Sequence, residues 1–306
     1  MLLVLSAFSA RGQYFRNSDY WKTHRSELSF GLGVSNFLGE LGGRDRIGSP
    51  FIYDLEFSQT KPALSLGMRY FVAEHAAVRG ALTYGVLAGN DNLTKETFRH
   101  NRNLSFKSNV FEAQVVFEFH PFLESLGHVY DLRGVQGQKS SRIGLYVFAG
   151  VGGFYFNPTT QLNGQWVELR PLGTEGQGLP DGPKPYSNYG FCIPMGVGLR
   201  KAVSKQISIG LELQYTKTFT DYIDDVSGTY YDNNAIRAAH GAQAAYLADP
   251  NLGEVAGQTF EGQQRGDPTD KDAYLFVKFQ VHYKLYKFRS ANKKYRTRIR
   301  RQKIVF

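Results

Sequence analysis

The sequence predicts an all-β fold: a transmembrane, antiparallel, up-and-down β-barrel of about eight strands with long extracellular loops. Aromatic residues make up 14% of the 306 residues, and most of them are Tyr and Phe, which favour strands. The mean hydropathy is −0.35, and no run approaches the roughly 20 apolar residues that a membrane-spanning helix needs. Several segments instead place apolar residues at every second position, as in strands with one lipid-facing side and one lumen-facing side.

The chain begins with an apolar segment. Residues 1–10 look like the core of a secretory signal that ends in small residues, although the expected positive start is missing. We therefore assign residues 1–13 as an incomplete signal peptide, with cleavage near Gln13, and residues 14–286 as the barrel. An ordinary N-terminal strand or a frayed apolar end is the alternative. Cys192 is the only cysteine, so neither an intrachain disulfide nor a zinc site of paired cysteines is expected.

Four alternating segments occur in the first half of the chain: residues 27–37, 64–70, 78–86 and 111–119. In the first of them, Phe30 and Leu32 share one face, while Glu27 and Ser29 share the other. A soluble sheet could show the same alternation. However, lipid-facing rows that are this apolar and this continuous are hard to keep in water, which favours the membrane barrel over a soluble β-sandwich.

Four more segments follow in the second half: residues 143–156, 193–199, 207–215 and 275–285. The first of these is rich in glycine, and either set of alternate residues could face the lumen. The last is the most regular, with Val277, Phe279 and Val281 on one face and Lys278 and Gln280 on the other. The eight segments together give an even number of strands, each near the roughly 9–11 residues that a tilted spanning strand requires.

The lengths of the connections predict the orientation in the membrane. Residues 72–76 and 202–205 are short links, and residues 121–141 form a link of moderate length. They alternate with long polar connections at residues 38–61, 89–107, 157–187 and 219–271. Short turns of such barrels face the periplasm and long loops face outward. An even number of strands then places the C-terminus in the periplasm.

Charged residues on the lumen-facing side predict an internal cluster. Arg69, Arg79 and Glu118 fall at one level near the periplasmic end, and Glu212 and Lys278 fall near mid-strand on two neighbouring strands. A barrel of about eight strands is filled by its own side chains, so such charges are more simply internal packing than a transport path. We therefore do not expect an open pore.

The longest loop opens with a group of carboxylates, Asp221, Asp224 and Asp225. These oxygens could bind a hard cation such as calcium, although their spacing does not match an EF-hand loop. The alternative is that the aspartates accept hydrogen bonds from the backbone and shape the loop.

Catalytic patterns are missing from the sequence. The histidines are scattered, and neither an HExxH nor a GxSxG motif occurs. We therefore expect no cofactor, no small-molecule substrate and no enzymatic activity. A barrel-embedded lipid hydrolase or acyltransferase is the alternative, and it would need a Ser or His at the membrane rim.

The C-terminal segment, residues 287–306, carries only positive charges. Its nine cations equal the whole formal net charge of +9, and they are Lys287, Arg289, Lys293, Lys294, Arg296, Arg298, Arg300, Arg301 and Lys303. A periplasmic location excludes nucleic acid as the partner, which leaves proteins and acidic lipid headgroups. A disordered, solvated end is the alternative.

Four passages resemble the PorG-like outer-membrane barrels of the Bacteroidetes type IX secretion system: residues 36–41 (NFLGEL), 146–158 (YVFAGVGGFYFNP), 172–179 (LGTEGQGL) and 218–227 (TFTDYIDDVS). The resemblance implies a non-enzymatic outer-membrane barrel that contacts a periplasmic ring of PorK-like and PorN-like lipoproteins. We expect the barrel to be monomeric and surrounded by outer-membrane lipid. The basic tail would then be the docking segment. A generic OmpA-like structural or adhesive barrel, whose loops bind external ligands, is the alternative function.

Overall fold

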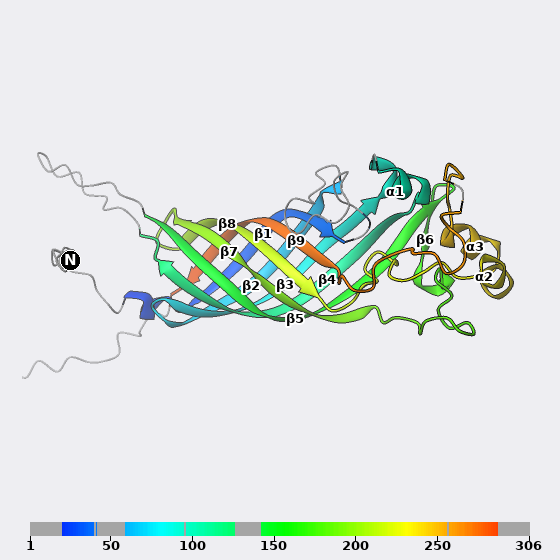
Figure 1. The fold of residues 1–306 in the computed structure, drawn as a ribbon. Helices are drawn as coiled ribbons and strands as arrows, with labels where there is room; N and C mark the ends of the chain where they lie inside the picture. Colours follow the sequence, from blue (N-terminus) through cyan, green and yellow to red (C-terminus); the bar gives the residue numbers. More distant parts are fainter. Residues whose placement is uncertain are drawn as a thin grey trace, which may run out of the picture.

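The computed structural model describes residues 20–39, 41, 59–94, 96–125, 142–255 and 257–286. Most of this part of the chain lies in long strands (Figure 1). The long strands are β1 (Ser26–Leu38), β2 (Lys61–Ala73), β3 (Ala76–Asn90), β4 (Ser105–Phe122), β5 (Ile143–Leu162), β7 (Tyr189–Ala202), β8 (Ile207–Thr218) and β9 (Ala273–Leu285). Each of them contains one of the alternating segments that the sequence predicts.

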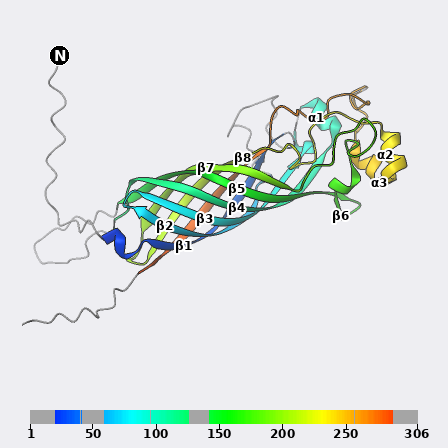
Figure 2. The same ribbon diagram turned by 90° about the horizontal axis from the view of Figure 1, so that it is seen from below.

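The long strands form a closed ring. Each strand pairs antiparallel with the strands that precede and follow it in the chain, apart from the short β6 hairpin strand described below. The ring closes because β1 pairs with β9 along its whole length, from Ser26 opposite Leu285 to Leu38 opposite Ala273. This arrangement confirms the predicted up-and-down barrel, and Figures 1 and 2 show it from two directions.

Alternation along each strand separates an outer from an inner face. On β1, Phe30 and Leu32 are 48% and 53% exposed on the outer wall, whereas Glu27 is buried in the lumen. The structure also resolves the facing of β5, which the sequence left open. Tyr146 points inward, and a Cβ atom on Gly198 of β7 would lie 2.1 Å from the Tyr146 ring, so this glycine makes room for the inward-facing ring.

The two ends of the barrel differ in their connections. At the end that we call the base, β1 begins, β9 ends, β2 turns into β3 through residues 74–75, and β7 is linked to β8 by residues 203–206. At the other end, the described parts of the long connections form a layer that we call the cap (Figure 1). Besides its loops, the cap contains α1 (Thr97–Arg102), β6 (Gln165–Glu168), α2 (Asn233–His240) and α3 (Ala242–Ala248). In the described part of the chain, no helix has the length and apolar character needed to cross a membrane.

Parts of the expected loops are strands in the structure. β3 continues to Asn90, β4 begins at Ser105, and β5 runs to Leu162, where it pairs with β6. Polar residues can extend a β-ladder into water without the apolar alternation that marks a spanning strand, so periodicity alone does not detect these extensions. The β5–β6 hairpin turns at Asn163-Gly164, and both residues have positive φ, at 52° and 82°. An Asn-Gly pair is a strong hairpin signal, and it was available in the sequence.

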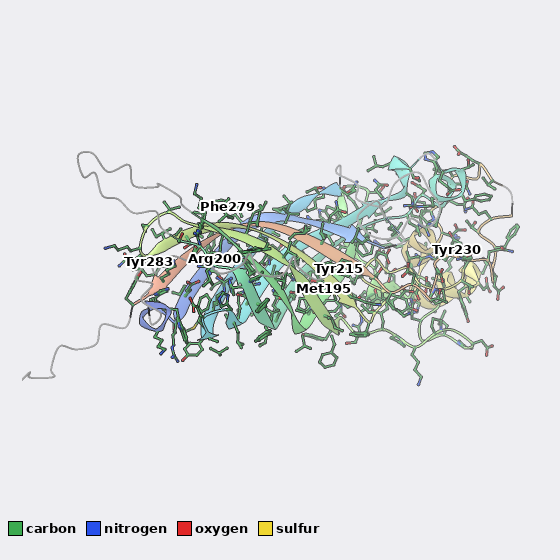
Figure 3. The ribbon with its side chains drawn as sticks, turned by 60° about the vertical axis from the view of Figure 1, so that its left-hand side comes forward. Met195, Arg200, Tyr215, Tyr230, Phe279 and Tyr283 are labelled. Atoms are coloured by element: carbon green, nitrogen blue, oxygen red, sulfur yellow. The ribbon has the colours of Figure 1, made fainter. Side chains whose placement is uncertain are left out.

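The lumen is filled by two kinds of side chain. Toward the cap lies a cluster that we call the apolar plug, made of Phe37, Leu87, Phe106, Val110, Phe154, Phe156, Tyr274 and Phe276. Its rings pack closely, with the centroids of Phe37 and Phe106 4.8 Å apart. Toward the base the inner face carries charged residues instead. Figure 3 shows how the side chains fill the barrel and the cap, with Arg200 in the half toward the base and Tyr230 in the cap.

Candidate functional site

The five predicted lumen residues lie in one connected chain of contacts. Arg69 Nη2 donates to Glu118 Oε1 at 3.1 Å, and Arg79 Nε donates to the same oxygen at 2.5 Å. Arg79 also reaches Glu212, with 2.9 Å between Nη2 and Oε2. Lys278 Nζ lies 3.1 Å from the other oxygen of Glu212. The sequence indicated two separate groups, and the structure joins them through Arg79.

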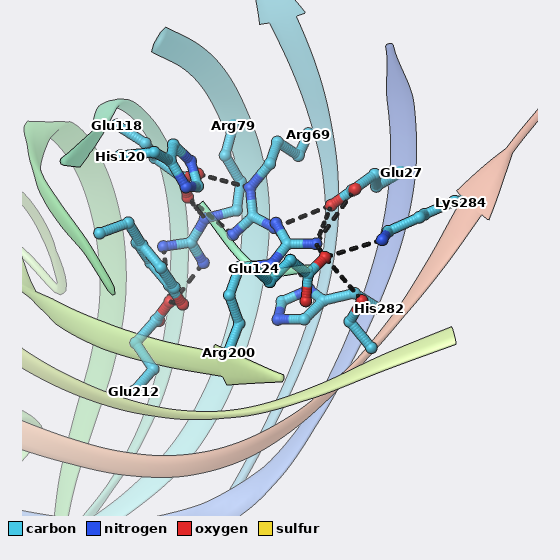
Figure 4. A network of polar contacts seen from close by, with 12 residues as sticks. Glu27, Arg69, Arg79, Glu118, His120, Glu124, Arg200, Glu212, His282 and Lys284 are labelled. Carbon is cyan, nitrogen blue, oxygen red and sulfur yellow. Dashed lines mark hydrogen bonds and ion pairs between the residues drawn. The ribbon is translucent and has the colours of Figure 1, made fainter. Parts of the chain in front are cut away.

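The backbone register explains why Glu118 lies at the centre of this chain. Arg69 and Arg79 stand directly opposite each other on β2 and β3. Like charges in opposing positions destabilise a sheet. Glu118, on the inner face of β4, accepts hydrogen bonds from both guanidinium groups and so offsets their repulsion (Figure 4).

The chain of ion pairs continues toward the base through residues that the sequence reasoning did not single out. Arg69 Nη1 lies 3.0 Å from Glu27 Oε2, and Arg200 Nη2 lies 3.0 Å from the same oxygen. Arg200 Nη2 also contacts Glu124 Oε1 at 2.8 Å, and Lys284 Nζ contacts that oxygen at 2.7 Å. The alternation could have found Arg200, because it follows Pro194, Gly196 and Gly198 on the inner side of β7. Glu124 lies in a connection, where no periodicity exists.

Toward the cap, hydrogen bonds connect the ion pairs to the apolar plug. Lys278 Nζ donates to Gln214 Oε1 at 2.7 Å, and Gln214 Nε2 donates to Glu112 Oε1 at 2.8 Å. The hydroxyl of Tyr274, a member of the plug, donates to Glu112 Oε2 at 2.6 Å. Tyr146 donates to Glu212 Oε2 at the same distance. We call this whole set of side chains the ionic network.

The ionic network is balanced in charge. Its cations are Arg69, Arg79, Arg200, Lys278 and Lys284, and its carboxylates are Glu27, Glu112, Glu118, Glu124 and Glu212. The ion-paired side chains are at most 10% exposed. Removing one partner of a buried pair leaves an uncompensated charge, which costs about 3–5 kcal/mol. This arrangement suits the network for holding the strands together across the lumen and for filling it.

The predicted calcium site is not formed. Asp224 uses its two carboxylate oxygens to accept hydrogen bonds from the backbone N–H groups of Leu41 and Val226, at 3.2 and 3.1 Å. Among the residues that the structure describes, no group of three or more His, Cys, Asp or Glu side chains could hold a metal ion. The calcium interpretation is therefore corrected in favour of its alternative, in which the aspartates shape the loop.

Asp225 and Asp221 are buried within the cap. The Asp225 carboxylate accepts hydrogen bonds from Thr174 Oγ1 at 2.5 Å and from the Tyr186 hydroxyl at 2.6 Å. Burial raises the pKa of Asp225 to about 6, and burial likewise raises the pKa of Asp221 to about 6. Asp225, one of the carboxylates that suggested a cation site, thus joins the β5–β7 connection to the β8–β9 connection.

Two predicted segments lie outside the described residues. They are the signal peptide, residues 1–13, and the basic tail with its nine cations, residues 287–306. The described chain ends at Tyr286, whose hydroxyl donates to the backbone oxygen of Lys205 in the β7–β8 link. The Tyr286 ring also lies beside His24, with 5.5 Å between centroids. The chain therefore enters the tail from the base of the barrel.

The outer wall is that of a membrane-spanning barrel. Large apolar side chains point outward from every long strand, for example Leu66, Leu82, Phe117 and Phe279, which are 50–62% exposed. Figure 3 shows Phe279, Met195 and Tyr283 along this wall. A closed ring satisfies the backbone hydrogen bonds within the sheet, which is the condition for a β-structure to lie in hydrocarbon.

A family model described as a domain of unknown function, DUF6089, matches residues 17–243, well over half of the chain. The chain belongs to the DUF6089 family. The matched region runs from before β1 into α3, so β9 and the basic tail follow the part of this DUF6089 protein that the family model covers. No curated protein matches the sequence.

Solved structures of outer-membrane proteins are distantly similar to this DUF6089 protein. Ail of Yersinia pestis is 10% identical, with 86% of this chain and 99% of that chain covered and a TM-score of 0.37. Neisserial surface protein A is 8% identical, with 85% and 97% covered and a TM-score of 0.37. Outer membrane protein W of E. coli is 13% identical, with 86% and 99% covered and a TM-score of 0.33. With scores this low, the description of the barrel rests on its own strand pairing.

Proposed function

We propose that this DUF6089 protein is an outer-membrane component of the type IX secretion system, and that its basic tail contacts the periplasmic ring of PorK-like and PorN-like proteins. In this role the protein binds a partner and catalyses no reaction. The proposal builds on the resemblance of the four passages to PorG-like barrels and on two physical features, the location of the tail and the filled lumen.

The observation that carries the proposal is the segregation of charge beyond the last strand. The nine cations after Tyr286 equal the net charge of +9, so the preceding part of the chain is neutral. β9 ends at the base, where the barrel has its shortest turns. Short turns of outer-membrane barrels face the periplasm. A polybasic segment at that position would meet acidic surfaces of periplasmic proteins.

The filled lumen supports a contacting role over a conducting role. The ionic network and the apolar plug occupy successive halves of the lumen, and both consist of buried side chains. A barrel of about eight strands has an interior just wide enough for its side chains. Secreted proteins would therefore cross the membrane through another component, while this barrel links that assembly to the outer membrane.

The test is a pull-down from detergent-solubilised outer membranes with the full chain and a chain truncated after Tyr286, followed by mass spectrometry. A third variant keeps the length of the tail but replaces its nine Lys and Arg residues with Gln. Ring lipoproteins should accompany the full chain and be lost with both variants, while all three barrels stay folded by heat-modifiable gel mobility. Ring association that survives truncation would contradict the proposal.

The ordered cap favours a second candidate function, a structural or adhesive barrel of the OmpA-like kind. The described part of the cap contains the helices α1, α2 and α3 and a buried ion pair, 2.9 Å between Arg265 Nη1 and Glu175 Oε1, so its loops form a stable surface. Deleting α2 and α3, residues 233–248, discriminates between the candidates. Under the second function, cells lose surface binding and keep ring association. Under the first, the deletion leaves secretion intact.

A further inference from the structure

The cap contains a crevice of about 290 Å3 where all of the long connections meet. Leu41 comes from the β1–β2 connection, Asn103 from β3–β4 and Leu169 from β5–β7, while Asp224 and Arg265 come from β8–β9. Binding sites of β-barrels commonly lie at the mouth, where loops on a rigid scaffold converge. The crevice is a separate feature from the ionic network, which lies toward the opposite end.

The side chains that line the crevice are mainly neutral hydrogen-bonding groups above an aliphatic floor. The polar groups are the amides and hydroxyls of Asn92, Asn103, Ser105, Thr160, Gln161 and Asn163. The floor includes Leu104, Leu169 and Leu247, all of them buried. The ring of Tyr246, which is 55% exposed, stands among these residues. Amides and hydroxyls both donate and accept hydrogen bonds, so this lining matches a ligand that does the same.

Contacts between the connections hold the crevice in shape. Asn103 Nδ2 donates to the Pro250 backbone oxygen at 2.9 Å, which joins the β3–β4 and β8–β9 connections. The hydroxyl oxygens of Ser105 and Thr160 lie 3.1 Å apart, which joins β4 to β5. A site that is formed before its ligand arrives loses less conformational entropy on binding.

The two charged residues of the crevice have partners within the cap, and one buried donor of Arg265 has none among the described residues. Asp224 and Arg265 already have partners within the cap: Asp224 accepts from the backbone N–H groups of Leu41 and Val226, and Arg265 forms an ion pair with Glu175, so the lining does not select for a strongly charged ligand. Arg265 is 3% exposed, and its Nη1 donates to Glu175 Oε1 and to the Asp225 backbone oxygen. Its Nε is buried and has no hydrogen-bond acceptor within the described part of the chain. Buried donors of this kind usually have an acceptor, such as a ligand or an ordered water molecule.

We propose that this crevice binds a neutral saccharide unit, either a free sugar or the terminal residue of a surface glycan. Sugar hydroxyls pair with the amides and hydroxyls of the lining, and the apolar face of a sugar ring packs on Tyr246. The volume is at the lower limit of ligand pockets, about 300 Å3, which fits a ligand of about one ring. This inference goes beyond the proposed secretion function, and it adds a ligand class that the sequence does not predict.

The experiment uses the detergent-solubilised full chain and saturation-transfer NMR with glucose, galactose, mannose and N-acetylglucosamine, and with glucuronate as a charged counterpart. A parallel arm presents neutral oligosaccharides immobilised on a surface. The crevice variant is Asn92→Ala with Tyr246→Ala. Its matched control is Asn234→Ala with Phe98→Ala, an exposed Asn and an aromatic ring of similar exposure, 57%, that do not line the crevice.

We expect at least one neutral sugar to bind the wild-type chain and the control, and to bind the crevice variant about tenfold more weakly, the effect of losing roughly 1.4 kcal/mol of contacts. Binding of immobilised oligosaccharides without binding of free sugars would identify a glycan terminus as the ligand. No neutral saccharide binding in either arm, equal binding by the two variants, or a preference for glucuronate would overturn the proposal. Gel mobility establishes that both variants are folded.

Discussion

The two halves of the lumen are filled by side chains of different chemistry. Toward the base, ion pairs such as Arg69–Glu118 and Arg79–Glu212 bridge the strands. Toward the cap, aromatic rings such as Phe37 and Phe106 pack against one another. Apolar packing tolerates small changes of shape, whereas a charged network depends on every partner being present. We therefore expect the stability of the barrel to be more sensitive to removal of a single group in the half of the lumen toward the base.

The largest effect is expected for Glu118→Ala. The substitution removes the carboxylate shared by Arg69 and Arg79 and leaves two buried cations with fewer partners. We expect the free energy of unfolding to fall by about 3–5 kcal/mol, measured by urea unfolding of the barrel refolded in detergent micelles. The exposed Glu168→Gln is the control, and it should change stability by less than about 0.5 kcal/mol. A loss at Glu118 as small as that of the control would show that the network contributes little.

A smaller loss is expected for Leu87→Ala in the apolar plug. Leu87 is fully buried, so its truncation leaves a cavity and should cost about 2–4 kcal/mol in the same unfolding assay. Leu82→Ala is a matched control on the same strand, because Leu82 is 62% exposed on the outer wall, where detergent or lipid fills the space. If the two Leu variants lose equal stability, the plug is not tightly packed.

The smallest effect is expected outside the membrane, in the pH dependence of the stability of the cap. Because the pKa of Asp225 is about 6 in the folded protein and 3.8 as its ordinary value, the folded cap holds this proton more tightly than the unfolded chain does. Its stabilising contribution is therefore full below pH 3.8 and is lost as the pH rises through about 6. We expect Asp225 to make the cap roughly 1.4 kcal/mol more stable near pH 5 than near pH 7.5.

Hydrogen exchange of the backbone N–H groups of Ser227 and Gly228 measures this difference. Both groups donate to Glu175 Oε1 in the cap beside Asp225. Asp225→Asn should reduce the pH dependence to the part that Asp221 contributes, whereas Asp267→Asn, in the same connection but exposed, should preserve it. Once exchange is expressed as protection relative to the intrinsic rate at each pH, lower protection near pH 5 than near pH 7.5 in the wild-type chain would show that the sign is wrong.

The period-two pattern of the sequence predicted the features that follow from the alternating inner and outer faces of a strand. It located the long strands and put Arg69, Arg79, Glu118, Glu212 and Lys278 on the inner wall, because one-residue alternation is the geometric rule of a strand. It could not show that Arg79 reaches Glu212, since that contact crosses the lumen between β3 and β8, which are not adjacent in the ring.

Other features gave weaker or no signals in the sequence. The facing of β5 depends on which glycines make room for Tyr146, and this is decided by the neighbouring strand rather than by β5 itself. The aspartates of the longest loop had the composition of a cation site, but their partners, such as Thr174 and Tyr186, come from a distant connection. Contacts between loops leave no pattern along one segment.

The contact between Arg79 and Glu212 has a consequence for the assembly of the protein in its membrane. These residues are 133 positions apart, and their strands come within reach of each other only when the sheet has curved into a ring. In a partly assembled sheet, Arg79 would face hydrocarbon or water without this partner, and an unpaired charge in the bilayer is costly. Insertion of single strands is therefore disfavoured, and closure of the barrel and its entry into the bilayer are coupled into one step.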